Sequence, residues 1–168
     1  MKKEKGKAVY ISRILFVIYL VVLIWLIVFK YPIPVLKSIM DEWELGNAKM
    51  GVATANLTPF KTIRMYMYHY HTLNGFDNLF GNILVFVPLG VLIPSAFRKA
   101  DRWWEILLHS FWLSLCLELF QLVSHFGAFD VDDMILNTLG GILGFGVFLI
   151  IRRLYRVCTG KEKCGSNG

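Results

Sequence analysis

The sequence predicts an all-α fold: a polytopic membrane bundle of four transmembrane helices with both termini in the cytoplasm. The first observation is composition, because 56% of the 168 residues are hydrophobic and only 18% are charged, which is too apolar for an ordinary soluble domain. The second is length, because four apolar stretches each approach the roughly 20 residues that a helix needs to cross a bilayer. The third is the uneven distribution of Lys and Arg among the connecting segments.

The first apolar stretch, 11–29, follows a basic N-terminal segment, 1–10. The two together look like a signal peptide, but the stretch ends in Trp25, Phe29 and Lys30 rather than in the small residues of a cleavage site. We therefore expect the stretch to be an uncleaved first membrane helix.

Three further spans are expected, at 79–97, 103–123 and 133–151. The second span contains Pro88, which removes a backbone hydrogen bond, so we expect a kink or a break there. The fourth contains Gly140 and Gly144, a pair of small residues typical of close packing between membrane helices.

The connecting segments complete the domain organisation. The long loop 30–78 is rich in aromatic residues, which favour the bilayer interface, and we expect part of it to lie on the membrane surface. A single membrane domain, 11–151, is thus predicted, followed by a basic tail, 152–168.

The distribution of basic residues predicts the orientation. Thirteen of the eighteen Lys and Arg residues lie in the N-terminal flank, the link between spans two and three, and the C-terminal tail, which four spans place on one side. By the positive-inside rule that side is the cytoplasm. The sequence pI of about 9.3 then reflects topology, and no nucleic-acid partner is expected.

This orientation brings polar residues from three spans to the outer face. Glu118 and Gln121 are three residues apart and share a helix face. Asp130, Asp133 and Asn137 share a face if the last helix begins near Asp130. Asn82 lies near the outer end of the second span.

Two interpretations of these residues are open. In the structural one, Asp130 caps the last helix, while Gln121 and Asn137 form hydrogen bonds between helices. In the functional one, the set forms a binding site, because ionisable groups in membrane helices are costly and usually serve a purpose. Carboxylates and amide oxygens would suit Mg²⁺ or Ca²⁺, so Glu118, Asp130 and Asp133 are the candidate ligands of a divalent cation.

Four sequence blocks resemble the VanZ-like family of small bacterial membrane proteins. In order, they are N-L-T-P-F at 56–60, G-N-I-L-V-F-V-P-L-G at 81–90, E-L-F-Q at 118–121 and D-V-D-D-M-I-L-N-T-L-G-G-I-L-G at 130–144. The resemblance implies a multi-pass protein of the bacterial cell membrane, in a family whose namesake is associated with low-level resistance to the glycopeptide teicoplanin. By position, it implies that the ligand site consists of Asn56, Asn82, Glu118, Gln121, Asp130, Asp133 and Asn137.

Three functions are compatible with these features. The favoured one is a non-enzymatic envelope protein that reduces the access of a glycopeptide antibiotic to its target. The second is a membrane enzyme acting on a lipid-linked phosphate or pyrophosphate of the cell wall, with Glu118 and Asp133 as acid–base groups or cation ligands. The absence of an obvious nucleophile or phosphate motif in the sequence counts against catalysis. The third is a structural partner in an envelope complex.

Overall fold

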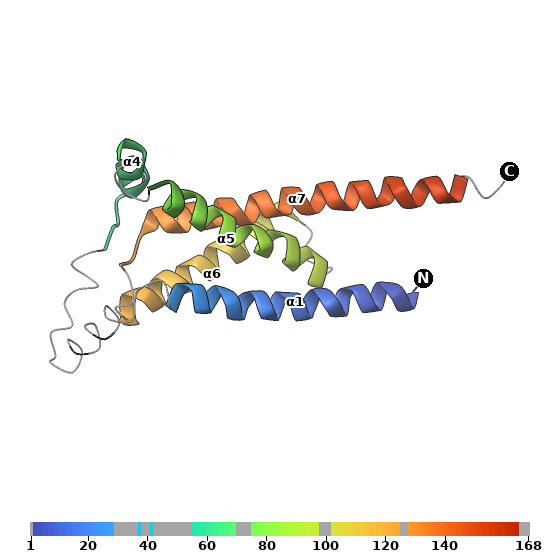
Figure 1. Ribbon diagram of the computed structural model, residues 1–168, viewed down its shortest axis with the longest axis horizontal. Helices are drawn as coiled ribbons and strands as arrows, with labels where there is room; N and C mark the ends of the chain where they lie inside the picture. Colours follow the sequence, from blue (N-terminus) through green and yellow to red (C-terminus); the bar gives the residue numbers. More distant parts are fainter. Residues whose placement is uncertain are drawn as a thin grey trace.

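The computed structural model describes residues 2–28, 37, 41, 55–69, 75–97, 102–124 and 128–164. It confirms the all-helical prediction, as Figure 1 shows. The main described helices are α1 (Lys2–Val28), α4 (Lys61–Tyr68), α5 (Gly75–Ala96), α6 (Trp103–Ser124) and α7 (Val131–Cys164).

Four helices are long and apolar enough to cross a membrane, as predicted. Their apolar segments are Gly6–Leu26, Asn78–Ala96, Trp103–Ser124 and Val131–Cys158. The first and last helices of the chain are longer than the predicted spans, since α1 begins at Lys2 and α7 continues to Cys164. The apolar pattern marks only the part that a bilayer would cover, whereas Lys and Arg are good helix formers and allow the helix to continue beyond it.

The closest helix packing is between α5 and α7, where glycines allow the two backbones to touch. A Cβ atom added at Gly140 would lie 2.1 Å from the carbonyl oxygen of Ile83. One added at Gly144 would lie 2.0 Å from the carbonyl oxygen of Val87. The prediction that these glycines serve close helix packing is confirmed, because no other residue could occupy either position without separating the helices.

Helix α5 runs without interruption through Pro88 and Pro94. The expected alternative of a break at Pro88 is therefore wrong. Helix α5 is packed against both α1 and α7, and the Tyr19 hydroxyl of α1 donates to the carbonyl oxygen of Val85, one turn before the proline, at 3.0 Å. Neighbouring groups of this kind let membrane helices tolerate proline.

Helix α1 packs chiefly against α5. Arg13 Nε donates to the carbonyl oxygen of Ala96 at 3.3 Å, at the end of α5 where carbonyls lack helical partners. The opposite face of α1 exposes large apolar side chains such as Val17, Val21 and Trp25. Apolar surface of this extent fits burial in a lipid bilayer.

The chain termini and the polar residues lie at opposite ends of the bundle. In Figure 1 the start of α1 and the end of α7 lie at one end of the molecule. Helix α4 lies at the other end, near the starts of α5 and α7. The polar residues singled out from the sequence belong to that second end. Much of the predicted loop 30–78 lies outside the described residues.

Candidate functional site

The segment before α4 is joined to the start of α7 by a short parallel β-bridge between Asn56 and Asp130. The Asn56 amide donates to the carbonyl oxygen of Phe129 at 2.7 Å, and the Val131 amide donates to that of Asn56 at 3.1 Å. The Asn56 side chain adds a hydrogen bond from Nδ2 to Asp130 Oδ1, 2.9 Å long. Two segments 74 residues apart in the chain are thus fixed side by side.

Asp130 also caps the start of α7. Its Oδ1 accepts a hydrogen bond from the Asp132 amide at 2.8 Å, which satisfies a donor that has no partner within the helix. Its Oδ2 accepts one from the Thr62 hydroxyl at 2.6 Å. The structural interpretation of Asp130 as a helix cap is therefore confirmed.

Asp132 is the fully buried acidic residue of this region, with 0% of its surface exposed. Its carboxylate accepts hydrogen bonds from the backbone amides of Phe60, Thr62 and Ile63 at 2.5, 2.7 and 3.0 Å. These amides belong to the start of α4, where the helix dipole favours a negative charge. We call this arrangement the α4 clamp, comprising Asp132 and these three amides.

The clamp was not predicted from the sequence. Asp132 was not singled out among the acidic residues at the start of the last span, and Thr62 had no assigned role. The only signal was the presence of both N-L-T-P-F and D-V-D-D blocks, which does not show which aspartate faces which segment.

Glu118 connects α6 to the same network. It is buried, with 3% exposed, and its Oε2 accepts a hydrogen bond from the Asp130 amide at 2.8 Å. The Glu118 carboxylate thus accepts a backbone hydrogen bond immediately before α7 begins. It links the network around Asp130 to the interior of the bundle.

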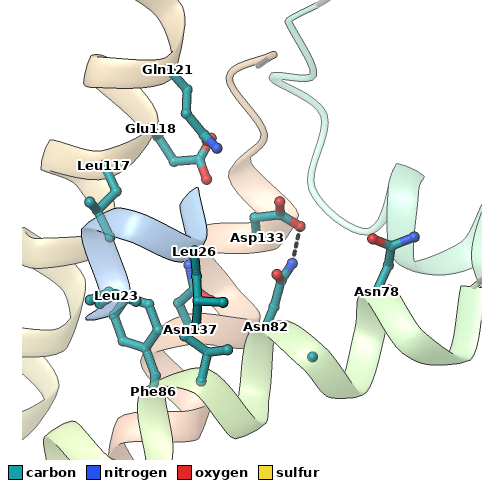
Figure 2. Close-up of a pocket in the computed structure, with 12 residues that line it drawn as sticks. Leu23, Leu26, Asn78, Asn82, Phe86, Leu117, Glu118, Gln121, Asp133 and Asn137 are labelled. Atoms are coloured by element: carbon teal, nitrogen blue, oxygen red, sulfur yellow. Dashed lines mark hydrogen bonds between the residues drawn. The ribbon is translucent and has the colours of Figure 1, made fainter. Parts of the chain in front are cut away.

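Beside this network lies a cavity of about 220 Å³, bounded by α1, α5, α6 and α7, which we call the polar cavity (Figure 2). Five of the seven predicted site residues line it: Asn82, Glu118, Gln121, Asp133 and Asn137. The other two, Asn56 and Asp130, lie in the adjoining network and do not line it. Leu23 and Leu26 of α1 form an apolar wall.

The lining residues differ in how far their polar groups are already engaged. Asn82 Nδ2 donates to Asp133 Oδ1 at 2.5 Å, across α5 and α7. Asn137 Nδ2 donates to the Ser114 hydroxyl at 2.9 Å, as the structural interpretation predicted. Gln121 is buried, with 8% exposed, and its carboxamide points toward the polar cavity beside Glu118 in Figure 2. Within the described part of the chain we find no hydrogen bond of the Gln121 side chain, so it is a polar group directed at the cavity.

The structure does not support the predicted cation site. Among the described residues, no three His, Cys, Asp or Glu side chains are placed to hold a metal ion. Glu118, Asp130 and Asp133 were the predicted ligands, but the Asp130 oxygens already accept from Asn56, Thr62 and the Asp132 amide. Capping and bridging explain Asp130 without a cation.

The polar cavity has an acidic and amide character. Glu118 and Asp133 provide carboxylates, and the asparagines and Gln121 provide carboxamides. None of the described side chains that line it is basic. Such a set accepts hydrogen bonds more readily than it binds anions.

Comparison with known proteins places the chain in a family. The model of the VanZ/LLP1 family matches residues 16–152. The chain is 30% identical over 141 residues to Protein VanZ of Enterococcus faecium, an alignment that covers 82% of this chain and 73% of that protein. No solved structure shows a significant match. The family match begins within the first apolar helix and ends within the fourth, and it includes every residue that lines the polar cavity, so this chain is a multi-pass membrane protein that belongs to the VanZ/LLP1 family.

Proposed function

We propose that this protein is a non-enzymatic membrane protein of the bacterial cell envelope that contributes to resistance to glycopeptides of the teicoplanin type. In this proposal the polar cavity opens at the outer face of the membrane and is the functional site. The observation that carries it is the convergence of polar side chains from α5, α6 and α7 on one cavity.

The cost of this arrangement supports a functional role. Ionisable side chains within membrane helices are costly and usually mark a functional site. Glu118 is buried at the end of an apolar helix, where leucine would pack at no such cost. Asn137 has a packing role through Ser114, but Gln121 has no comparable hydrogen bond within the described part. A ligand would explain why Gln121 is directed at the cavity.

The outward orientation is supported by charge. In the sequence, four spans put thirteen of the eighteen Lys and Arg residues on the same side as the two termini, so the positive-inside rule assigns that side to the cytoplasm. The polar cavity is lined by Asn78 and Asp133, near the starts of α5 and α7. In Figure 1 these helix starts lie at the opposite end of the bundle, with α4. Glycopeptides and their cell-wall targets lie on that side of the membrane, and the relative at 30% identity is a protein named VanZ.

The test is resistance in a strain lacking the gene, complemented with single variants. Wild-type protein should raise the minimal inhibitory concentration of teicoplanin, whereas Glu118→Gln and Gln121→Ala should not. Val123→Ala is the matched control on the same helix, because Val123 is 70% exposed and lies outside the lining of the cavity. Full resistance in both cavity variants, at equal membrane levels, would refute the assignment of the cavity.

A membrane enzyme acting on a lipid-linked phosphate is the second candidate. It is favoured by one observation, that Glu118 and Asp133 line the same cavity. Purified protein would be incubated with labelled lipid-linked pyrophosphate and Mg²⁺. Turnover that Glu118→Gln abolishes would establish the enzyme and replace the first proposal.

A further inference from the structure

A second cavity lies between α1 and α6, and its character is entirely different. It has a volume of about 360 Å³ and is lined by apolar side chains, among them Leu20, Ile24, Leu113, Cys116 and Phe120. We call it the apolar groove. Helix α1 packs chiefly against α5, and α6 packs chiefly against α7, so these two helices leave a gap between them. In a membrane such a gap between spans would be filled by hydrocarbon.

The apolar groove adjoins the polar cavity. Leu23 of α1 and Leu117 of α6 line both. Ile24 and Phe120 lie at the depth of these shared positions, whereas Leu20 on α1 and Leu113 on α6 extend the groove away from the α4 end. From Leu26 to Leu20 the rise along α1 is about 9 Å, at about 1.5 Å per residue. A polar compartment near the end of the bundle therefore leads into an apolar one nearer its middle.

We propose that the two compartments together bind one membrane lipid, with its head group in the polar cavity and a hydrocarbon chain in the apolar groove. The inference rests on the proposed function in one respect, the use of the polar cavity as a ligand site. The size of that cavity selects a small head group, since about 220 Å³ is below the roughly 300–1,000 Å³ of sites for drug-sized ligands.

The chemistry of the polar cavity selects a head group that donates hydrogen bonds. Glu118 and Asp133 offer carboxylate acceptors, and Gln121 offers a carboxamide that can accept and donate. A phosphate would bring its negative charge against these carboxylates, and none of the described lining side chains is basic. Sugar hydroxyls carry no charge and donate hydrogen bonds to such groups. The structure therefore assigns a glycolipid with one sugar ring in the polar cavity.

Cys116 provides a reporter within the apolar groove, because it is a free, exposed cysteine of the lining. Protein carrying Cys158→Ser and Cys164→Ser would be reconstituted in phosphatidylcholine nanodiscs. The rate of alkylation by an apolar maleimide is then measured with added monoglycosyl diacylglycerol or with phosphatidylglycerol. The glycolipid should slow alkylation roughly tenfold at about ten times its Kd, by the factor 1 + [L]/Kd. Phosphatidylglycerol should leave the rate unchanged.

Two variants assign the protection to the polar cavity. Gln121→Ala should abolish the protection by glycolipid, whereas Val123→Ala, on the exposed face of α6, should retain it. Equal protection by both lipids would overturn the head-group assignment. No protection by the glycolipid would overturn lipid binding.

These outcomes are separate from those of the resistance assay. Resistance that depends on Glu118 and Gln121, without protection of Cys116 by glycolipid, would overturn the lipid inference and leave the proposed function standing. Protection of Cys116 without any effect on teicoplanin susceptibility would support the lipid site and remove the proposed function.

Discussion

Replacing Asp132 with asparagine should release α4 from the start of α7. The carboxylate accepts three amide hydrogen bonds, one at Oδ1 and two at Oδ2. Asparagine keeps one acceptor oxygen and puts an NH₂ group in place of the other, so at least one amide of the α4 clamp must face a donor. Hydrogen bonds to a charged group contribute about 1.5–3 kcal/mol each, and a buried donor without a partner costs about 1–3 kcal/mol. We therefore expect the docking of α4 to weaken by about 3 kcal/mol.

Amide hydrogen exchange measures this loss directly. The amides of Phe60, Thr62 and Ile63 bond to Asp132, whereas the Arg64 amide bonds within the segment to the Phe60 carbonyl at 3.0 Å. A loss of about 3 kcal/mol corresponds to exchange about a hundredfold faster at the clamped amides. Glu105→Gln, the same chemical change at the start of α6, should leave them unchanged. Unchanged exchange at the clamped amides in the Asp132→Asn variant would refute the clamp.

Two further predictions concern the packing of the helices. Gly144→Ala should destabilise the bundle by about 1–3 kcal/mol, the usual cost of overpacking, because its added methyl would meet the Val87 carbonyl oxygen. Gly146→Ala is its control, since a Cβ at Gly146 has nothing within 4 Å. Denaturant unfolding in detergent compares them, and equal stability would contradict the close approach of α5 and α7. Tyr19→Phe removes the hydroxyl bond to Val85 and should cost about 0.6 kcal/mol, the average for hydrogen bonds between membrane helices. In the same assay, a loss of unfolding free energy above about 2 kcal/mol in Tyr19→Phe would contradict this prediction, because it exceeds the range measured for one hydrogen bond between membrane helices.

The sequence was a good guide where one chemical property decides the structure. Apolar length predicts the four crossing helices, and the spacing of Gly140 and Gly144 predicts close packing against another helix, which the structure shows to be α5. Topology then brought Asn82, Glu118 and Asp133 to one end of the bundle. In each case the deciding feature is hydrophobicity or residue size, both of which are written in the residues themselves.

The sequence was a poor guide where the partner of a polar group is backbone. Asp132 accepts hydrogen bonds from amides some 70 residues earlier in the chain. Nearly every residue has a backbone amide, so the sequence does not show which amides will be its partners. The cation hypothesis had a related weakness, because carboxylate type alone does not show that capping and bridging already engage Asp130. The expected break at Pro88 did not occur in a helix that packs against both α1 and α7, and the proline itself does not reveal such neighbours.

The most direct test of the central claim is whether the polar cavity opens to the outside of the cell. Gly81 lines the cavity, and a Cβ there has nothing within 4 Å, so Gly81→Cys would place a thiol in it without a clash. This variant, in a background lacking the native cysteines, is treated in intact cells with a membrane-impermeant cationic thiol reagent. The native Cys158 alone, exposed toward the other end of α7, is the control. We expect the reagent to modify the Gly81→Cys protein and abolish teicoplanin resistance, and to leave Cys158 unmodified. Modification of Cys158 with the Gly81→Cys thiol protected would contradict it.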